Sequence, residues 1–208
     1  CLFVLWLIFD DWYFNVMANL GFIGLGVMGK PMAEHLMKAG HKLFLHSRSG
    51  VPEDLICQGG QLMASPKEVA ACSEIVFTML PDTRDVEMVL FGNQGIAEGL
   101  QSRKDSICIV IDMSSISPIE TQKFAQKIKI LGHDYVDAPV SGGDIGAKDA
   151  TLTIMVGSSA ETFAAVKPLF ELMGKTITHV GENGAGQICK VANQILVSIT
   201  IEAVAEAL

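Results

Sequence analysis

The chain has 208 residues, of which 50% are hydrophobic, and it carries a formal net charge of −8 at pH 7. This length can bury one full hydrophobic core with some chain left over. The acidic balance argues against nucleic acid or an anionic membrane surface as a partner, but not against a small anionic ligand, which responds to local donors. The 5 cysteines have no CxxC or metal-ligand spacing, which favours reduced thiols in a cytoplasmic protein without a metal site.

The first sixteen residues, CLFVLWLIFDDWYFNV, differ in character from the rest. Their apolar run is shorter than the about 20 residues that span a bilayer, and it lacks the basic region and cleavage site of a signal peptide. Met17 stands just ahead of the first predicted strand. We expect residues 1–16 to be an atypical extension with the native start at Met17, and the alternative is an extra strand or helix packed on the domain.

Short apolar segments alternate with helical patterns along residues 17–181. The predicted strands are 20–24, 42–46, 75–80, 107–113, 135–140, 151–156 and 176–180. The predicted helices are 28–39, 66–71, 84–90, 118–131 and 160–173. Strands that alternate with helices form βαβ units around a mainly parallel sheet. The sequence therefore predicts an α/β fold, a doubly wound dinucleotide-binding domain of Rossmann type over residues 17–181.

Local signals support two of these helices. Ser117 before Pro118 is typical of an N-cap with proline at the first helical position, and Glu120 completes a capping-box pattern. Gly40 and Gly132 stand where a helix commonly ends in a left-handed residue.

Residues 182–208 show no further strand pattern. The segment ILVSITIEAVAEAL is apolar on nearly all sides, and such a helix is normally buried. We expect this segment to be the truncated start of an interdomain helix that leads into a second, helical domain.

A glycine-rich hexapeptide follows the first predicted strand and opens the first predicted helix. Its pattern, GxGxxG, permits a tight turn, close approach of a pyrophosphate and close packing of helix on strand, with the helix N-terminus directed at phosphate. The alternative is a purely structural turn. The predicted cofactor-binding residues here are Gly24, Leu25, Gly26, Val27, Met28 and Gly29.

The end of the second predicted strand bears on the choice of cofactor. An acid there is typical of NAD binding, whereas a cation accommodates the 2′-phosphate of NADP. This chain has Ser47 and Arg48 and no carboxylate, so the sequence favours NADPH over NADH, with NADH as the alternative. Arg48 could equally be an exposed loop residue.

Three further strand ends carry polar or turn-forming residues, and ligands of open α/β sheets sit at that edge. The Ser141-Gly142-Gly143 turn exposes a hydroxyl and successive backbone N–H groups that could hold a carboxylate, although such turns are more often merely flexible. The other two stretches are Met79-Leu80-Pro81 and Ser114-Ser115.

Lys190 occupies an unusual place in GAGQICKVANQ. A cation is unfavourable near a helix N-terminus, and Asn193 and Gln194 share its helical face. Its apolar neighbours would lower its pKa and help it to give up a proton. The alternative is an ordinary solvated lysine.

Four ordered segments resemble the β-hydroxyacid dehydrogenases, and most closely the tartronate semialdehyde reductases. They are GFIGLGVMGKPMAEHLMKAGH, DMSSISPIET, DYVDAPVSGGDIGAKDATLTIMVG and GAGQICKVANQ, and the resemblance runs from about Met17 to Leu208. It implies NAD(P)H-dependent reduction of tartronate semialdehyde, a small anionic oxo acid, to glycerate. It also implies a homo-oligomeric full-length protein. The extension at 1–16 and the missing helical second domain depart from the family pattern.

The resemblance also implies residue roles. The catalytic lysine of the family falls on Lys190, its Ser-Gly-Gly substrate loop on Ser141, Gly142 and Gly143, and its amide partner on Asn193. Where Gln194 stands, some members have asparagine. The SSIS stretch and MLP turn line the cofactor cleft in the family, which assigns Ser114, Met79, Leu80 and Pro81 to the cofactor and Ser115 to the substrate.

Three alternatives stay open at this point. A 3-hydroxyisobutyrate dehydrogenase is commonly NAD-linked and would be favoured by an acid after the second strand. A 6-phosphogluconate dehydrogenase would need further groups for the substrate phosphate. A fragment that binds a dinucleotide without turnover is the alternative from outside the enzymes.

Overall fold

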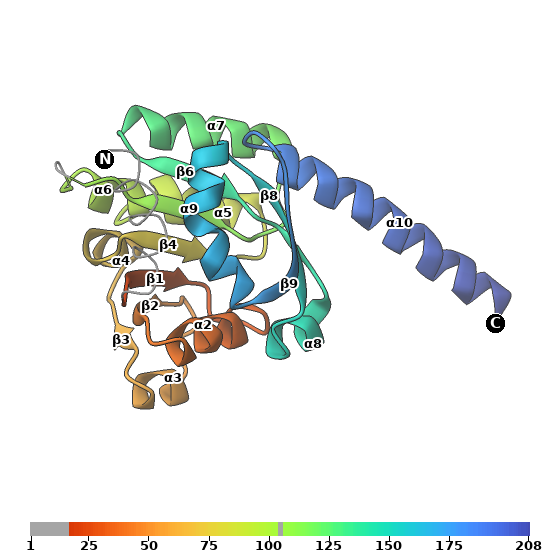
Figure 1. The fold of residues 1–208 in the computed structure, drawn as a ribbon, viewed down its shortest axis with the longest axis horizontal. Coiled ribbons are helices and arrows are strands. Elements are labelled where there is room, and N and C mark those ends of the chain that lie inside the picture. Colours follow the sequence, from red (N-terminus) through yellow and green to blue (C-terminus); the bar gives the residue numbers. More distant parts are fainter. Residues whose placement is uncertain (1–16, 104–105) are drawn as a thin grey trace, which may run out of the picture.

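The computed structural model describes residues 17–103 and 106–208, and the expected extension at 1–16 lies outside them. Within these residues a nine-stranded sheet has the order β3-β2-β1-β4-β5-β6-β8-β7, with β9 paired to β8 (Figure 1). The strands are β1 Asn19–Ile23, β2 Lys42–His46, β3 Gln61–Leu62, β4 Ile75–Thr78, β5 Ile109–Asp112, β6 Asp134–Asp137, β7 Val140–Ser141, β8 Leu152–Gly157 and β9 Gly174–Gly181. All pairs from β3 to β6 are parallel, whereas β8 is antiparallel to β6 and β7.

Helices cover both faces of the sheet. They are α2 Gly29–Lys38, α3 Glu53–Cys57, α4 Pro66–Cys72, α5 Thr83–Phe91, α6 Ile96–Leu100, α7 Pro118–Ile130, α8 Gly143–Lys148, α9 Ala160–Glu171 and α10 Ala185–Ala207. One core cluster draws on α2, α3, α8 and α9, and the other draws on α4, α5, α6 and α7. Successive residues of β4 alternate between these clusters, since strand side chains point to opposite faces. The predicted doubly wound, mainly parallel fold is confirmed.

The predicted strand at 135–140 is wrong in one respect, because the structure divides it into two. β6 ends at Asp137, and the chain then turns through Ala138 and Pro139 before β7 pairs antiparallel with β8. Pro139 has no N–H to continue a ladder, although its carbonyl oxygen accepts from the Met155 N–H at 3.1 Å. The antiparallel return directs the Ser-Gly-Gly segment along β8.

The sequence did not predict the shortest helices and strands. α3, α6 and α8 have five or six residues and β3 has two, too few for a periodic pattern. The helix ends were better specified: Gly40 and Gly132 adopt positive φ angles of 95° and 86° just beyond α2 and α7, as predicted.

The capping box predicted at α7 is only half formed. Ser117 caps the helix, since its hydroxyl accepts from the Glu120 N–H. The return bond from Glu120 is not made among the described residues: its carboxylate pairs with Lys123 at 2.8 Å, and the Ser117 N–H donates to the Thr83 hydroxyl at 3.2 Å. The box prediction was wrong because a lysine one turn further on and a neighbouring helix offered competing partners.

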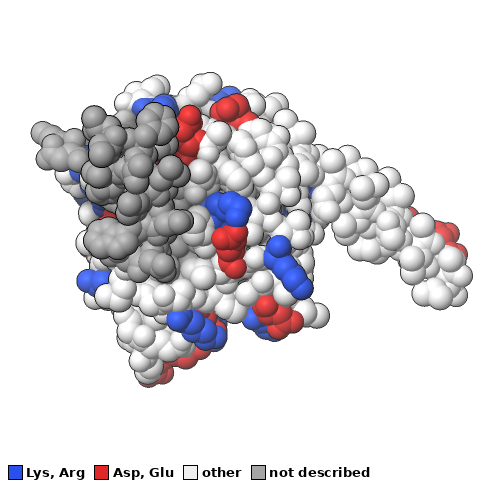
Figure 2. All heavy atoms as spheres, viewed as in Figure 1, with Lys and Arg blue, Asp and Glu red and all other residues white. Residues whose placement is uncertain are grey.

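Helix α10 projects from the domain as an arm (Figure 1). Its buried residues are only Gly186 and Gln187, near its start, and the surface of the arm carries little charge apart from the acidic residues near its tip (Figure 2). Among the described residues, α10 is the one helix whose length and composition would permit a membrane crossing, a property that core helices share. Its first turn is therefore where contact with the domain is concentrated.

Phe22 and Phe77 belong to the same core cluster. They are register partners on β1 and β4, both fully buried, and their rings stack with centroids 5.8 Å apart. Phe77→Ala should lower the free energy of unfolding by about 3–5 kcal/mol, because a cavity remains where the ring was. Urea titration measures this loss. Ile130→Ala, at a side chain that is 84% exposed, is the control and should change stability by less than about 0.5 kcal/mol. Equal effects of the two substitutions would contradict the assigned core.

Candidate active site

The glycine-rich loop joins β1 to α2 with its glycines in sterically demanding places. Gly24 has a φ of 95°, and its N–H donates to the His46 carbonyl oxygen at 3.0 Å. A Cβ there would overlap the Met79 carbonyl oxygen, and a Cβ on Gly29 would overlap the Gly24 carbonyl oxygen. A Cβ on Gly26 would instead meet no atom within 4 Å. The first and third glycines thus permit the turn and the packing, while the second borders open space that a pyrophosphate can approach.

This open space belongs to a cleft of about 730 Å³ at the carboxyl ends of β1, β2 and β4. It brings together eleven of the residues that the sequence predicted for the cofactor: Gly24, Leu25, Gly26, Val27, Met28, Gly29, Ser47, Arg48, Met79, Leu80 and Pro81. Its lining also includes residues outside the predicted set: Ile23, His46, Ser49, Pro66, Asp85, Met88 and Val89. Ile23 and His46 end β1 and β2, and Ser49 follows β2, so these three lie at strand ends where a ligand is expected. The other four belong to α4 and α5, and no local motif marks them because they reach the cleft only through the packing of these helices.

Arg48 lies at the edge of this cleft. Its guanidinium pairs with the Asp85 carboxylate at 3.1 Å, and its side chain is 86% exposed. Ser47 and Ser49 lie beside it and share a hydrogen bond of 3.3 Å. Because the guanidinium side of this ion pair is exposed to water, the pair contributes little to stability, and Arg48 can exchange Asp85 for another anion at small cost.

Ser114 and Ser115 have different environments after β5. Ser114 is fully buried and its hydroxyl accepts from the Leu80 N–H at 2.9 Å, which ties this loop to the MLP turn below the cleft lining. Ser115 is exposed. The fully buried Asp112 carboxylate organises the loop by accepting from the Ser114 N–H at 3.1 Å and the Thr78 hydroxyl at 2.8 Å. Burial raises the pKa of Asp112.

The Ser141-Gly142-Gly143 segment joins β7 to α8. Ser141 pairs with Thr153 of β8, and the two glycines take positive φ angles of 134° and 63°. Ser141 is partly exposed and both glycines are exposed, so their polar groups are accessible. The segment is better ordered than a flexible loop because a ladder holds one end and a helix starts at the other.

Lys190 lies in the second turn of α10 and is partly buried. This burial lowers the pKa of its ammonium group. Among the described residues its ammonium takes part in none of the ion pairs or hydrogen bonds. Asn193 is also partly buried and donates to the Gln194 side chain at 3.0 Å. Lys190 is therefore a partly desolvated cation, and it does not line the dinucleotide cleft described above.

Asp137 connects this helix to the sheet. Its carboxylate, at the end of β6, accepts from the Gly184 N–H at 2.7 Å and from the Gln187 N–H at 3.0 Å. Burial raises the pKa of Asp137 to about 6, against the opposing effect of these two N–H donors, and the neighbouring Asp112 carboxylate raises it further. The prediction missed Asp137 and Gln187 as site residues, although a buried acid at a strand end facing a glycine-led helix was a usable signal.

Comparisons with known proteins identify the family of this chain. The family profile described as the NAD-binding domain of 6-phosphogluconate dehydrogenase matches residues 19–181. The chain belongs to this family. The predicted resemblance to the hydroxyacid dehydrogenases within it is confirmed.

Individual relatives are hydroxyacid oxidoreductases or carry a nicotinamide dinucleotide. The 2-hydroxy-3-oxopropionate reductase of Escherichia coli is 53% identical over 91% of this chain and 64% of its own length. The 3-hydroxyisobutyrate dehydrogenase of Mycobacterium tuberculosis, solved with L-serine, has a TM-score of 0.83 and 32% identity, covering 92% of this chain and 64% of that one. Psf3, solved with NADP+ and 2-OPP, has a TM-score of 0.81 and 28% identity, covering 90% and 66%. The chain thus spans less than two thirds of the length of these relatives.

The burial of Asp137 predicts a pH-dependent stability. Because its pKa in the folded chain is about 6, above the ordinary 3.8, its stabilising contribution is complete below about pH 4 and is lost as the pH rises through 6. The difference in unfolding free energy between the wild type and Asp137→Asn should therefore fall, by an amount on the order of 2 kcal/mol, from pH 4 to pH 7. Urea titrations across this range measure it.

Asp144 is the matched control. Lys148 beside it lowers the pKa of its carboxyl, so its contribution to stability is lost as the pH falls. The difference between the wild type and Asp144→Asn should accordingly change in the opposite direction. The assigned environment of Asp137 would be contradicted if the free-energy difference for Asp137→Asn did not change with pH. It would also be contradicted if this difference changed in the same direction as that for Asp144→Asn.

Proposed function

We propose that the protein containing this chain is an NADPH-dependent reductase of a small anionic oxo acid, with tartronate semialdehyde as the substrate and glycerate as the product. The observation that carries this proposal is Lys190, a half-buried lysine with a lowered pKa on the helix that starts at the carboxyl ends of β5 and β6. Similarity to the Escherichia coli reductase, 53% identical, supports the substrate.

The cleft residues fit a dinucleotide. Gly26 leaves open space beside the N-terminus of α2, whose first N–H groups and dipole favour phosphate. Arg48, with Ser47 beside it, would hold the 2′-phosphate of NADPH by exchanging its contact with Asp85. The Met79–Pro81 turn, which lies against Gly24, would line the cleft beside the glycine loop. When bound, the reduced nicotinamide supplies the hydride.

The residues of the chain then bind the substrate and supply the proton. Ser141 and the N–H groups of Gly142 and Gly143 would hold the substrate carboxylate, with Ser115 beside them. Lys190 would donate a proton to the carbonyl oxygen as this oxygen gains negative charge, and Asn193 would orient the oxygen or the lysine. A lysine with a lowered pKa releases its proton more readily, which is the requirement for a general acid near neutral pH.

A 3-hydroxyisobutyrate dehydrogenase is the second candidate. It is supported by the similarity to the Mycobacterium tuberculosis enzyme, 32% identical. The residues after β2 favour the reductase, since Ser47 and Arg48 stand where an acid would be typical of an NAD-linked enzyme. Turnover of tartronate semialdehyde and of 3-hydroxyisobutyrate, measured on one preparation with NADPH and NADH, separates the two candidates.

Removal of the lysine tests the proposed proton donor. Lys190→Ala should lower kcat for aldehyde reduction by about 10²–10⁴-fold with little change in NADPH affinity, because only the proton transfer is lost. In the wild type, kcat should fall as the pH rises through the pKa of Lys190, at a pH below that of an ordinary lysine. Lys175→Ala, at an exposed lysine of β9, is the control and should leave kcat unchanged. Near-normal turnover of Lys190→Ala would remove this residue from the mechanism.

Cofactor preference tests the role of Arg48. Arg48→Ala should weaken NADPH binding by about tenfold or more, since charge-assisted bonds to the 2′-phosphate are lost, and should leave NADH binding nearly unchanged. Fluorescence titration with both cofactors measures the two dissociation constants. A wild-type preference for NADH, or an equal loss for both cofactors, would contradict the assignment.

A further inference from the structure

The start of α10 depends on a side chain from another element. The cap residue Gly184 has a φ of 93° and offers no side-chain cap, so the first N–H groups of the helix need outside acceptors. Asp137 provides both of its carboxylate oxygens, one to the Gly184 N–H at 2.7 Å and one to the Gln187 N–H at 3.0 Å. A negative group is also favourable at this end of the helix dipole.

The backbone packs closely around this carboxylate at two glycines. A Cβ on Gly157 of β8 would lie 2.6 Å and 2.7 Å from the two Asp137 oxygens. A Cβ on Gly186 would lie 2.8 Å from one of these oxygens and 2.5 Å from the Met155 carbonyl oxygen. Two glycines on different elements therefore allow α10 to approach β6 and β8 this closely.

Gln187 makes a second attachment on the same turn. Its side-chain N–H donates to the Ser114 carbonyl oxygen at 2.7 Å, and its side-chain oxygen accepts from the Ile116 N–H at 3.1 Å. Gln187 is 1% exposed, so these bonds are shielded from water. One amide thus satisfies both a donor and an acceptor of the loop that follows β5.

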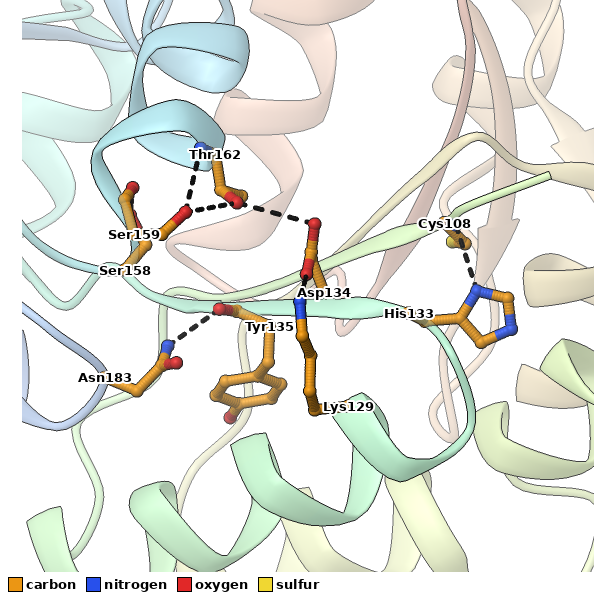
Figure 3. A network of polar contacts seen from close by, with 9 residues as sticks. All are labelled: Cys108, Lys129, His133, Asp134, Tyr135, Ser158, Ser159, Thr162 and Asn183. Atoms are coloured by element: carbon orange, nitrogen blue, oxygen red, sulfur yellow. Dashed lines mark hydrogen bonds and ion pairs between the residues drawn. The ribbon is translucent and has the colours of Figure 1, made fainter.

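The segment that leads into the helix is fixed as well. The Asn183 side chain points at β6, where its N–H group donates to the Tyr135 carbonyl oxygen at 2.7 Å (Figure 3). It also donates to the Gly157 carbonyl oxygen at 3.2 Å. Asn183, Asp137 and Gln187 together attach the start of α10 to three segments: β6, the end of β8 and the loop that follows β5.

We propose that Asp137 and Gln187 are positioning residues that hold α10, and with it Lys190, at the carboxyl ends of β5 and β6. Lys190 follows Gln187 by three positions and so lies one turn on along the same side of the helix. Beyond Gln187, no residue of α10 is fully buried within the described structure, so these two attachments set the place of the lysine. This inference rests on the proposed role of Lys190 as the proton donor.

Backbone amide exchange tests the attachment without reference to catalysis. In Asp137→Asn, an amide NH₂ group replaces one carboxylate oxygen, so one N–H of the α10 start loses its acceptor. In Gln187→Leu, both bonds to the 114–116 loop are lost. Exchange at residues 184–190 should rise by about tenfold or more in each variant, while β4 and β5 keep wild-type exchange.

Matched controls are present in the chain. Asp134→Asn makes the same change at the other end of β6, where the carboxylate pairs with Lys129 and contacts Thr162 (Figure 3). Gln126→Leu makes the other change at an exposed position of α7. Both should leave exchange at 184–190 unchanged. Gln187→Glu keeps the acceptor for the Ile116 N–H but places an oxygen against the Ser114 carbonyl oxygen. This variant replaces Gln187→Leu in the exchange experiment if Gln187→Leu does not fold.

Steady-state kinetics of the full protein that contains this chain tests whether the attachment of α10 affects the function of Lys190. Asp137→Asn and Gln187→Leu should lower kcat by about 10²-fold with the KM for NADPH unchanged, because the donor is misplaced while the cofactor cleft is intact. The decrease of kcat at high pH, the high-pH limb of the pH profile, should move to higher pH in these variants because Lys190 becomes more exposed to water. A purely structural role would leave the position of this limb unchanged.

The outcomes separate the two proposals. If Lys190→Ala abolishes turnover while the positioning variants keep wild-type exchange and kcat, the positioning role is wrong and the proposed function stands. If Lys190→Ala retains turnover, the proposed function fails, even where the exchange of α10 increases. Faster exchange at 184–190 with normal kcat and an unmoved limb would also overturn the positioning role.

Discussion

The buried carboxylate of Asp137 at the start of α10 is the interaction on which the candidate site depends. Burial of this group is unfavourable for its charged form, which is why its pKa rises to about 6. Two N–H donors from the helix start offset part of this cost. The chain therefore buries a titratable group whose charged form is disfavoured, and this group holds a projecting helix at a defined place on the sheet.

Two strand ends share this task. Asp112 and Asp137 are register partners on β5 and β6, and each organises the segment that follows or faces its strand. Asp112 orders the 114–116 loop through the Ser114 N–H, and Gln187 then joins that loop to the helix. The cofactor cleft at β1, β2 and β4 connects to the same loop, because the Ser114 hydroxyl accepts from the Leu80 N–H. A continuous set of hydrogen bonds thus runs from the MLP turn to α10.

Sequence patterns predicted what depends on local chemistry. The long strands and helices were recognisable from their apolar periodicity, and Ser117, Gly40 and Gly132 from the requirements of helix ends. The patterns failed where tertiary contacts determine the hydrogen-bond partner of a side chain or the end of a strand. The Glu120 carboxylate pairs with Lys123 instead of the Ser117 N–H. Pro139 separates β6 from β7 within an apolar segment that was predicted to be one strand.

The same division applies to the candidate site. The glycine loop and Arg48 were visible because their spacing from a strand is fixed, and the structure brings them to one cleft. Asp85 and Asp137 were not visible, since their importance comes from residues 37 and 47 positions away that only the fold brings close. Lys190 was recognisable as an anomaly of its helix, but the attachment that fixes its position was not.

The most direct measurement is a side-chain nitrogen NMR titration of the lysines in labelled protein, with the spectrum of Lys190→Ala used for assignment. The structure predicts that the Lys190 resonance titrates below the range of an ordinary lysine, because burial disfavours its charge. In Asp137→Asn the same resonance should titrate at higher pH, as α10 loosens and the ammonium becomes hydrated. An unshifted Lys190 in the wild type, or one that does not respond to Asp137→Asn, would contradict the claim that a buried carboxylate holds a desolvated proton donor in place.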